Sequence, residues 1–361
     1  MKKNYPKKNQ KVFVGLSGGV DSAVSAALLK KDGYEVTGVF IKAWTPEGYP
    51  CTWKEDRRSA MRVAAVLDIP FITLDLEKEY KKEVVDYMIT EYQEGRTPNP
   101  DVMCNKEIKF GHFLKFALNN GADFVATGHY CQKIFNSQFS IFNLKEGADK
   151  DKDQSYFLWT LTQDQIKRVL FPIGHLSKSE VRKLAKKFGL PQATRKDSQG
   201  LCFLGKIDMQ EFLSKYIPPK RGNVLLENGK IIGHHNGALF FTIGQRHGFT
   251  VTKKTEEMGP MYVVSKNIEN NTITVAPKET KTKKSLPLGS GHNYVNIKEI
   301  NLNGKVPNKN LTCRIRYRQE KIGCKLEEDR VIFEKPQTGI APGQSLVLYN
   351  GEICLGGGVI S

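Results

Sequence analysis

The chain has 361 residues, of which 39% are hydrophobic and 26% charged, so it is long enough for two or three soluble domains with buried cores. Lysine and arginine exceed aspartate and glutamate by 17, which favours a polyanionic partner such as nucleic acid, although a solvated lysine surface would have the same composition. No segment approaches the length of a membrane span and no two of the seven cysteines form a C-x-x-C pair, so we expect no membrane association, no structural zinc and no iron–sulfur cluster.

The first segment, Met1–Gln10, is rich in lysine and contains no apolar stretch. We therefore expect a disordered basic tail and not a secretory signal. Without such a signal, and with an odd number of cysteines, the chain is predicted to be cytoplasmic and to carry reduced thiols.

An apolar run, Val12–Leu16, predicts a buried strand that leads into the loop Ser17–Ser22 (S-G-G-V-D-S) and then into a helix over Ala23–Leu29. A strand, a glycine-rich turn and a helix N-terminus in this order form a cradle for an anion, because glycines let backbone N–H groups approach a phosphate. The spacing fits neither a Walker loop nor a dinucleotide-binding fingerprint. It resembles the PP-loop of the N-type ATP pyrophosphatases, which hold the pyrophosphate of ATP.

Strand-like and helix-like segments alternate through the first half of the chain, which predicts a mostly parallel, doubly wound sheet. The strands are expected at 36–41, 71–76 and 123–127, and the helices at 56–67, 79–92, 107–118, 154–170 and 178–188. Ligands of such sheets bind beyond the carboxyl ends of the strands, so the loops after Leu16, Ile41 and Thr127 are expected to face one site.

The alternation ends before Pro218-Pro219, and short β-like runs follow. These runs are expected at 238–243, 261–264, 272–275, 311–317, 330–333 and 345–349, with a Lys/Thr/Ser linker at 278–285. We predict a tail (1–10), an α/β catalytic domain (11–217), a small β-rich domain with a linker (218–284) and a C-terminal barrel-like β domain (285–361).

Two cysteines lie in polar loops. Cys104 follows a double-proline loop, 96–103, near an expected helix N-terminus that would lower its thiol pKa, and Asp101 is close enough in sequence to exchange a proton. Cys202 follows cationic residues and a glycine turn, which is a similar setting. Taken alone each is a weak signal, because most lone cysteines are buried structural residues.

Seven motifs occur in an order that covers almost the whole chain: S-G-G-V-D-S, G-R-T-P-N-P-D-V-M-C-N-K-E-I-K-F-G, A-T-G-H-Y, K-D-Q-S-Y-F-L, K-D-S-Q-G-L-C-F-L-G, F-T-I-G-Q-R and A-P-G-Q-S. Together they make the sequence resemble the tRNA-specific 2-thiouridylases. The resemblance implies an adenine nucleotide alpha hydrolase-like catalytic domain that replaces O2 of the wobble uridine, position 34, by sulfur in tRNAs for Lys, Glu and Gln. It also implies ATP with Mg²⁺, tRNA, and a sulfur donor that is a cysteine desulfurase or a relay protein. A monomer is expected, although the sequence does not reveal the oligomeric state.

The resemblance also assigns roles to residues. Asp101 would be the general acid/base, Cys202 would carry a persulfide, and Cys104 would release the sulfur, either through a transient disulfide with Cys202 or by direct attack. The residues implied to bind ATP are Gly15, Leu16, Ser17, Gly18, Gly19, Val20, Asp21, Ser22, Ile41 and Gly128. The target base would lie among Asn99, Pro100 and Asp101, and the implied tRNA contacts are His129, Lys152, Asp153, Gln154, Arg316, Tyr317 and Gln344.

The segment Arg314–Arg318 is expected to be a strand with its three arginines on one face and Tyr317 on the other, and a solvated edge strand would have the same pattern. Two other functions fit parts of the sequence. One is a PP-loop ligase or amidotransferase that makes a small molecule, and the other is a non-catalytic RNA-binding protein built on a nucleotide-binding fold.

Overall fold

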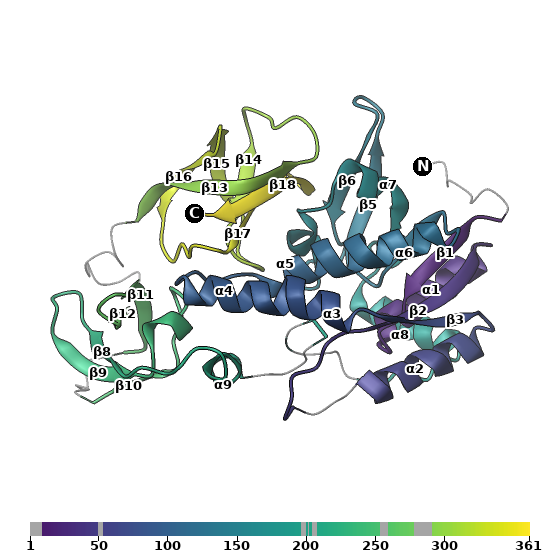
Figure 1. Cartoon of the computed structure of the whole chain (residues 1–361). Coiled ribbons are helices and arrows are strands. Elements are labelled where there is room, and N and C mark those ends of the chain that lie inside the picture. Colours follow the sequence, from purple (N-terminus) through teal and green to yellow (C-terminus); the bar gives the residue numbers. More distant parts are fainter. Residues whose placement is uncertain are drawn as a thin grey trace.

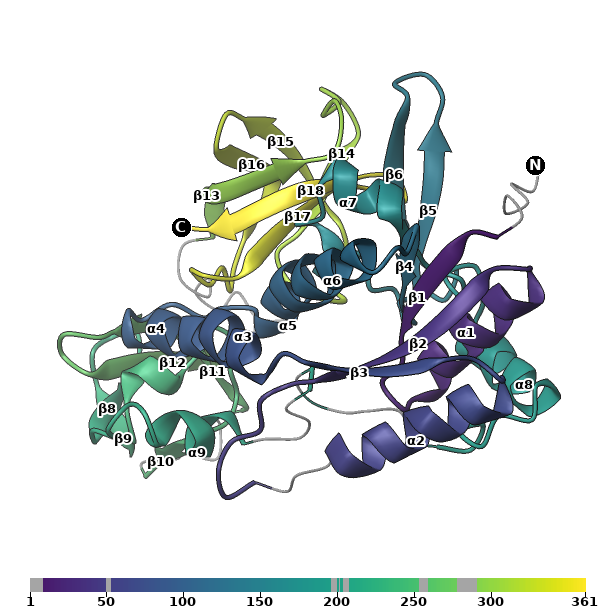
Figure 2. The same cartoon turned by 45° about the vertical axis from the view of Figure 1, so that its right-hand side comes forward.

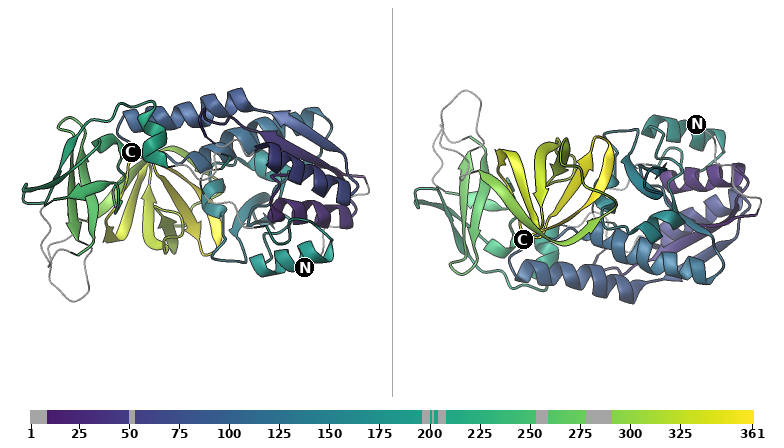
Figure 3. Two further views of the ribbon diagram at one scale, coloured as in Figure 1. Left: turned by 90° about the horizontal axis from the view of Figure 1, so that it is seen from below. Right: turned by 90° about the horizontal axis from the view of Figure 1, so that it is seen from above.

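The computed structural model describes residues 9–49, 53–195, 200, 202–203, 208–252, 259–277 and 291–361 (Figure 1). Residues 1–8 of the expected tail and the expected linker at 278–285 lie outside the described residues. The described residues form a parallel α/β sheet, a five-stranded β module and a closed β-barrel. In Figure 3 the barrel lies between the β module and the parallel sheet.

The parallel sheet has the order β3-β2-β1-β4-β7, and every neighbouring pair in it is parallel. Its strands are β1 (Lys11–Gly15), β2 (Glu35–Lys42), β3 (Phe71–Asp75), β4 (Phe124–Ala126) and β7 (Val169–Leu170). All five carboxyl ends therefore lie along one edge of the sheet.

Helices cover both faces of this sheet (Figure 2). Val12 and Val14 pack toward α1 (Val20–Lys31), α2 (Trp53–Val66) and α8 (Lys178–Lys187). Phe13, between them, points to the opposite face, as the alternation of a strand requires. On that face α6 (Phe113–Asn119) packs against β4. The other helical segments on this side are α3 (Glu77–Tyr80), a π-helical segment (Lys81–Asp86), α4 (Tyr87–Gln93), α5 (Pro100–Met103) and a second π-helical segment (Cys104–His112), and α4 extends from the sheet to the β module (Figure 2). The predicted doubly wound sheet is confirmed.

The segment expected to be one helix at 154–170 is broken. It forms a 3₁₀ turn (Ser155–Leu158), α7 (Gln163–Arg168) and the strand β7. The helix α7 starts afresh because Thr162 and Gln165 form a reciprocal capping box. An unpredicted hairpin, β5 (Cys131–Asn136) and β6 (Ile141–Glu146), precedes this segment.

The β module packs directly on the α/β domain. The buried Phe241 of this module belongs to one continuous core with Tyr92 of α4. The module follows α9 (Met209–Ser214), and its sheet has the order β10-β9-β8-β12-β11. Its strands are β8 (Gly222–Leu225), β9 (Ile231–His235), β10 (Phe249–Val251), β11 (Met261–Asn267) and β12 (Thr272–Pro277). The strand expected at 238–243 is instead a 3₁₀ turn (Ala238–Phe240). It follows Gly237, whose φ of +142° lies outside the region of a strand.

The C-terminal barrel has the order β13-β16-β15-β14-β17-β18 and closes through the pairing of β13 with β18, which confirms the barrel-like prediction. Its strands are β13 (His292–Leu302), β14 (Leu311–Arg314), β15 (Ile322–Glu327), β16 (Arg330–Gln337), β17 (Ser345–Asn350) and β18 (Ile353–Ile360). Gly356 allows the closure, because a Cβ there would lie 2.0 Å from the carbonyl oxygen of Asn301. The strand β18 also pairs with β6, which joins the barrel to the α/β domain.

Candidate active site

The loop Ser17–Ser22 connects β1 to α1, and hydrogen bonds among its own residues define its shape. The backbone N–H of Ser17 donates to Ser22 Oγ at 3.2 Å, and Ser22 Oγ donates to the carbonyl oxygen of Gly19 at 3.2 Å. Gly18 has a φ of +78°, and a Cβ there would lie 2.6 Å from the carbonyl oxygen of Asp56. Among the described residues no side chain caps the start of α1, so the N–H groups of its first turn are left for an anion.

The loop after β4 lies against this cradle. A Cβ on Gly128 would lie 2.7 Å from the backbone nitrogen of Ser22, so only glycine fits there. Ile41 is buried in β2, two residues beyond Val39, which pairs with Gly15. The residues predicted to bind ATP therefore come from three adjacent strand ends.

A lysine and a tyrosine that sequence reasoning missed hold Asp21. Lys178 Nζ lies 2.8 Å from both carboxylate oxygens of Asp21, and the Tyr130 hydroxyl donates to Oδ1 at 2.7 Å. Lys178 opens α8 directly after the capping Ser177, so the helix start was readable from the sequence but its partner was not. The arrangement places a partly buried ammonium at the rim of the anion cradle.

The double-proline loop is held by the barrel. Gln344 donates from Nε2 to the carbonyl oxygens of Thr97 and Pro98 at 2.9 and 3.1 Å, and the N–H of Thr97 donates to the carbonyl oxygen of Pro342 at 2.8 Å. Asn99 then caps α5, because its Oδ1 accepts from the N–H of Val102 at 3.3 Å. Pro100 is the first residue of α5, a position whose N–H has no partner within a helix, so the missing N–H of proline costs no hydrogen bond. The barrel thus positions the loop that carries the predicted target-base residues.

The structure brings Asp101, Cys104 and Cys202 together. The N–H of Cys202 donates to Asp101 Oδ1 at 3.0 Å, and the hydroxyl of the buried Tyr80 donates to the carbonyl oxygen of Cys202 at 2.6 Å. The two cysteines are separate thiols. Of the expected cysteine motif at 195–205, only Arg195, Gly200, Cys202 and Phe203 are among the described residues.

Of the two thiols, Cys202 has the lowered pKa and Cys104 the raised pKa. A hydrogen bond from the Cys104 thiol lowers the pKa of Cys202 to about 7, burial opposes this shift, and the Lys109 ammonium supports it. Burial raises the pKa of Cys104 well above its usual value, and its hydrogen bond to Cys202 raises it further. The expectation of a lowered pKa for Cys104 is therefore wrong, because burial is the largest influence on this thiol.

A cavity of about 430 Å³ lies between all three parts of the molecule. Six of the residues predicted to contact the target base or the tRNA line this cavity. The ring centroids of Tyr317 and Phe157 lie 4.4 Å apart. Its lining residues are Met88, Tyr92, Thr97, Pro98, Asn99, Pro100, Asp101, Phe157, Met209, Thr242, Arg316, Tyr317 and Gln344. A mostly apolar wall with one carboxylate and one guanidinium suits a flat, polar-edged group such as a base.

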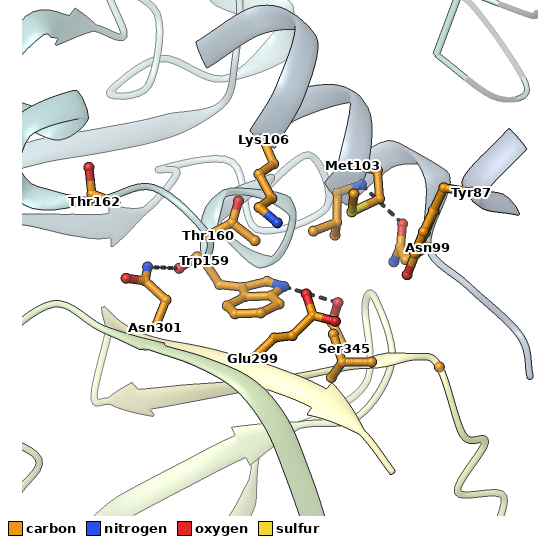
Figure 4. Close-up of a pocket in the computed structure, with 13 residues that line it drawn as sticks. Tyr87, Asn99, Met103, Lys106, Trp159, Thr160, Thr162, Glu299, Asn301 and Ser345 are labelled. Atoms are coloured by element: carbon orange, nitrogen blue, oxygen red, sulfur yellow. Dashed lines mark hydrogen bonds between the residues drawn. The ribbon is translucent and has the colours of Figure 1, made fainter. Parts of the chain in front are cut away.

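A second cavity, of about 220 Å³, lies on the other side of Asn99, between α5 and the barrel (Figure 4). Trp159 lies at its floor and donates from Nε1 to Ser345 Oγ at 3.0 Å. Lys106 and Glu299 reach it from the helix and the barrel. Asn99 lines both cavities, so a change at this residue affects both.

Four other predicted tRNA contacts lie apart from the larger cavity. His129 is 6% exposed, between the rings of Phe110 and Phe171, and Asp153 is 4% exposed. Gln154 Oε1 accepts from the N–H of Tyr130 at 3.0 Å, and the Lys152 side chain is partly exposed. In this structure the side chains of His129 and Asp153 are therefore internal.

The basic segment at 314–318 differs from the expected strand. The strand β14 ends at Arg314, and the residues after it turn, with Arg318 at a φ of +63°. Arg314 points into the protein toward Asp153, at 3.1 Å, whereas Arg316 donates to the carbonyl oxygens of Ile243 and Gly339. The arginines therefore do not share one face.

No group of three or more His, Cys, Asp or Glu side chains among the described residues is arranged to hold a metal ion. Within the same residues, no helix is both long enough and apolar enough to cross a bilayer.

Three family models match the chain: a "tRNA methyl transferase HUP domain" over residues 10–206, a "tRNA methyl transferase PRC-barrel domain" over 210–277 and an "Aminomethyltransferase beta-barrel domain" over 293–360. A protein of Streptococcus thermophilus (strain LMD-9), named tRNA-specific 2-thiouridylase MnmA, is 43% identical over 97% of this chain and 95% of its own length. Relatives of the same name from Streptococcus mutans and Geobacillus thermodenitrificans are 44% and 43% identical over 97% of this chain and cover 95% and 94% of their own lengths. With this coverage and identity, the chain belongs to the tRNA-specific 2-thiouridylase family.

Proposed function

We propose that this protein is an ATP-dependent tRNA thiolase that replaces O2 of the wobble uridine, position 34, by sulfur in tRNAs for Lys, Glu and Gln. The observation that carries the proposal is the low-pKa thiol of Cys202 beside Cys104 and Asp101, where Asp101 lines a cavity large enough for a base. Two of the family models are described as tRNA methyl transferase domains, whereas the relatives that match almost the whole chain are named 2-thiouridylases. Thiolation uses both thiols, one to carry the sulfur and one to release it.

The Ser17–Ser22 loop fits the phosphates of ATP. Gly18 and Gly128 leave space that a Cβ would fill, and the start of α1 carries no side-chain cap among the described residues. We propose that Gly15 to Ser22, Ile41 and Gly128 bind ATP, with Mg²⁺ balancing phosphate charge. Attack of the uridine O2 on the α-phosphate would then release pyrophosphate and turn an inert carbonyl oxygen into a leaving group.

We propose that the two cysteines carry out the sulfur transfer. A sulfur donor, a cysteine desulfurase or a relay protein, would load Cys202 as a persulfide, whose terminal sulfur forms a bond to C2 as the C2–O bond breaks and AMP leaves. In one route Cys104 then attacks Cys202 Sγ, which frees the thiolated base and leaves a disulfide that a cellular thiol reduces. In the other route Cys104 attacks Cys202 Sγ first, which forms the Cys104–Cys202 bond and frees hydrogen sulfide, and that sulfur then bonds to C2 as the C2–O bond breaks and AMP leaves. We propose that Asp101 acts as the general acid/base in these steps.

The tRNA would lie across the cavity. We propose that Asn99, Pro100 and Asp101 surround the flipped base and that Arg316, Tyr317 and Gln344 line its path. The predicted contacts of His129, Lys152, Asp153 and Gln154 remain part of the proposal only as positions near the tRNA, because the side chains of His129 and Asp153 are internal. The excess of 17 positive charges would attract the tRNA.

We further propose a cytoplasmic monomer made of a basic tail (1–10), a catalytic domain (11–217), a central β domain with a linker (218–284) and a barrel (285–361) that docks tRNA. Sedimentation of the free protein and of its tRNA complex tests the stoichiometry.

The decisive experiment is thiolation of unmodified tRNA by the purified protein with ATP, Mg²⁺ and a persulfide donor, followed by nucleoside mass spectrometry. We expect 2-thiouridine with the wild type and none with Cys202→Ala, while tRNA binding persists. Cys324→Ala, which removes a thiol from the barrel core, serves as the control. Asp21→Ala should stop the release of pyrophosphate. Undiminished thiolation by Cys202→Ala would refute the persulfide role, and ATP turnover driven by a small amine or acid without tRNA would refute the function.

A further inference from the structure

The backbone of Cys202 is bound on both sides by side chains from other elements. The N–H of Cys202 donates to Asp101 Oδ1 of α5 at 3.0 Å, and the hydroxyl of Tyr80, the last residue of α3, donates to the carbonyl oxygen of Cys202 at 2.6 Å. Asp101 has a proposed role beside the target base, whereas the proposed function gives Tyr80 none. The hydroxyl bond joins residues that lie 122 positions apart in the chain.

The residue that follows Cys202 has a backbone conformation that its side chain does not favour. Phe203 has a φ of +63°, in a region that glycine enters readily and a bulky side chain rarely does. Such a conformation persists only where its surroundings hold it. The ring of Phe203 packs edge-on against that of Tyr80, with the centroids 5.8 Å apart and the planes at 83°. Tyr80 therefore contacts this turn twice, through its hydroxyl and through its ring.

Tyr80 is itself fixed in the protein interior. Its side chain is 1% exposed and belongs to the same hydrophobic core as Cys104. Burial raises the pKa of Tyr80 well above its usual value, so the hydroxyl keeps its proton and can donate it. On the other side of Cys202, Asp101 is joined to Cys104, because the N–H of Cys104 donates to the carbonyl oxygen of Asp101. The two contacts therefore tie the backbone of Cys202 to the elements that surround Cys104.

Ordinary burial of a tyrosine is the competing explanation. A buried hydroxyl needs a hydrogen-bond partner, and any carbonyl oxygen within reach would satisfy it. This explanation does not account for the positive φ of Phe203, nor for a second hydrogen bond that holds the N–H of Cys202. The two explanations differ in what loss of the Tyr80 hydroxyl changes. Ordinary burial predicts a loss of stability alone, whereas positioning predicts a change at the pair of thiols.

We propose that Tyr80 is a positioning residue which, together with Asp101, holds the backbone of Cys202 so that its thiol stays beside that of Cys104. The inference rests on the proposed function only for its purpose, which is to keep the thiol that carries the sulfur within reach of the thiol that releases it. Tyr80 acts through the backbone of Cys202 and takes no part in making or breaking bonds.

The test measures how readily the two thiols join in the full-length protein without tRNA or ATP. In glutathione redox buffers, the thiols of Cys104 and Cys202 lose two electrons and two protons as they form a disulfide, and one glutathione disulfide becomes two glutathiones. Peptide mass spectrometry identifies the disulfide and gives its equilibrium constant. Tyr80→Phe should lower this constant about fivefold, the effect of losing one hydrogen bond. Tyr349→Phe is the control and should match the wild type, because this buried tyrosine lies in the barrel, with its hydroxyl 3.4 Å from Ser155 Oγ.

A second measurement follows the backbone of Cys202 directly, by NMR of protein with labelled cysteine. In the wild type the Cys202 amide should exchange with deuterium more slowly than an unprotected amide, because Asp101 accepts its hydrogen bond. In Tyr80→Phe the exchange should be about fivefold faster. An unprotected Cys202 amide in the wild type would overturn the proposal even where the variant fails to fold. An unchanged equilibrium constant or an unchanged exchange rate in folded Tyr80→Phe would overturn it as well. Both readouts are independent of tRNA, so the proposed function can fail while this inference stands, and the reverse also holds.

Discussion

Replacing Asp153 by alanine is expected to destabilise the fold more than it weakens any direct contact with RNA. The carboxylate is only 4% exposed. It accepts hydrogen bonds from the N–H groups of Gly147 at 3.0 Å and Ser155 at 3.1 Å, from the Ser155 hydroxyl at 2.9 Å, and from Arg314 at 3.1 Å. It therefore joins the end of β6, the 3₁₀ turn and the barrel.

The size of the effect follows from these four bonds. Each donor left without an acceptor in a buried site costs about 1–3 kcal/mol. Removing one partner of a buried ion pair costs about 3–5 kcal/mol. The cost is smaller here, because the Arg314 guanidinium still pairs with Glu146, whose Oε1 lies 3.2 Å away. We therefore expect Asp153→Ala to lower the free energy of unfolding by roughly 3–5 kcal/mol.

Guanidinium unfolding followed by far-UV circular dichroism measures the loss, and hydrogen exchange of residues 153–159 shows where it occurs. Because three domains need not unfold in one step, the variants are compared by midpoint and by segment. Asp164→Ala is the control: its carboxylate is 95% exposed and pairs with Lys167 at 3.4 Å, so its removal should change stability by less than about 0.5 kcal/mol. If Asp153→Ala is as stable as the control but no longer binds tRNA, the reasoning is refuted and Asp153 contacts the RNA directly.

Three further predictions concern the site. Gly128→Ala should raise the KM for ATP at least about tenfold, measured by pyrophosphate release, because its Cβ would lie 2.7 Å from the backbone nitrogen of Ser22 and displace the loop; an unchanged KM would contradict the close contact. Gln344→Ala should raise the KM for tRNA while ATP-dependent chemistry on saturating tRNA persists, because the proline loop loses two hydrogen bonds to the barrel; the opposite split would show a direct role in the reaction. Cys104→Ala should move the half-maximal pH for alkylation of Cys202 upward from about 7, since the thiol hydrogen bond that favours the Cys202 thiolate is gone; a midpoint that stays or falls would be inconsistent with that bond.

Local patterns predicted the α/β domain well. The strand, loop and helix at 12–29 were readable because alternation places Val12 and Val14 on one face and Phe13 on the other, and because glycine and serine have definite uses in such a turn. The parallel order of the sheet followed from the alternation of strands and helices. The barrel was suggested by short strands at regular spacing, but its closure depends on Gly356, whose role is visible only from the neighbouring carbonyl oxygen.

The misassigned elements have physical causes. The segment 154–170 contains helix-forming residues, yet Tyr156 and Trp159 turn inward to bond Ser345 of the barrel, a partner far away in sequence. The capping pattern of Thr162 and Gln165 was the available local signal that a new helix starts there. Tertiary packing overrode the helix propensity of the segment.

The site was only partly predictable for the same reason. Motif resemblance named Asp101, Cys104 and Cys202, but which thiol is acidic depends on burial and on Lys109, which no local pattern reveals. The contact of Lys178 with Asp21 joins residues far apart in the chain. Residue type and spacing predict which groups are present, whereas their pKa values depend on the finished fold.

The pairing of β18 with β6 has a consequence for the order in which the protein is made. The strand β6 is synthesised long before its partner strand β18, whose Ile353 and Cys354 pair with Lys145 and Leu144 of β6. Until then β6 has an unpaired edge, and unpaired strand edges invite association with other chains. We expect truncation before β18 to produce aggregation in addition to loss of the barrel, so the last strand protects an element synthesised much earlier.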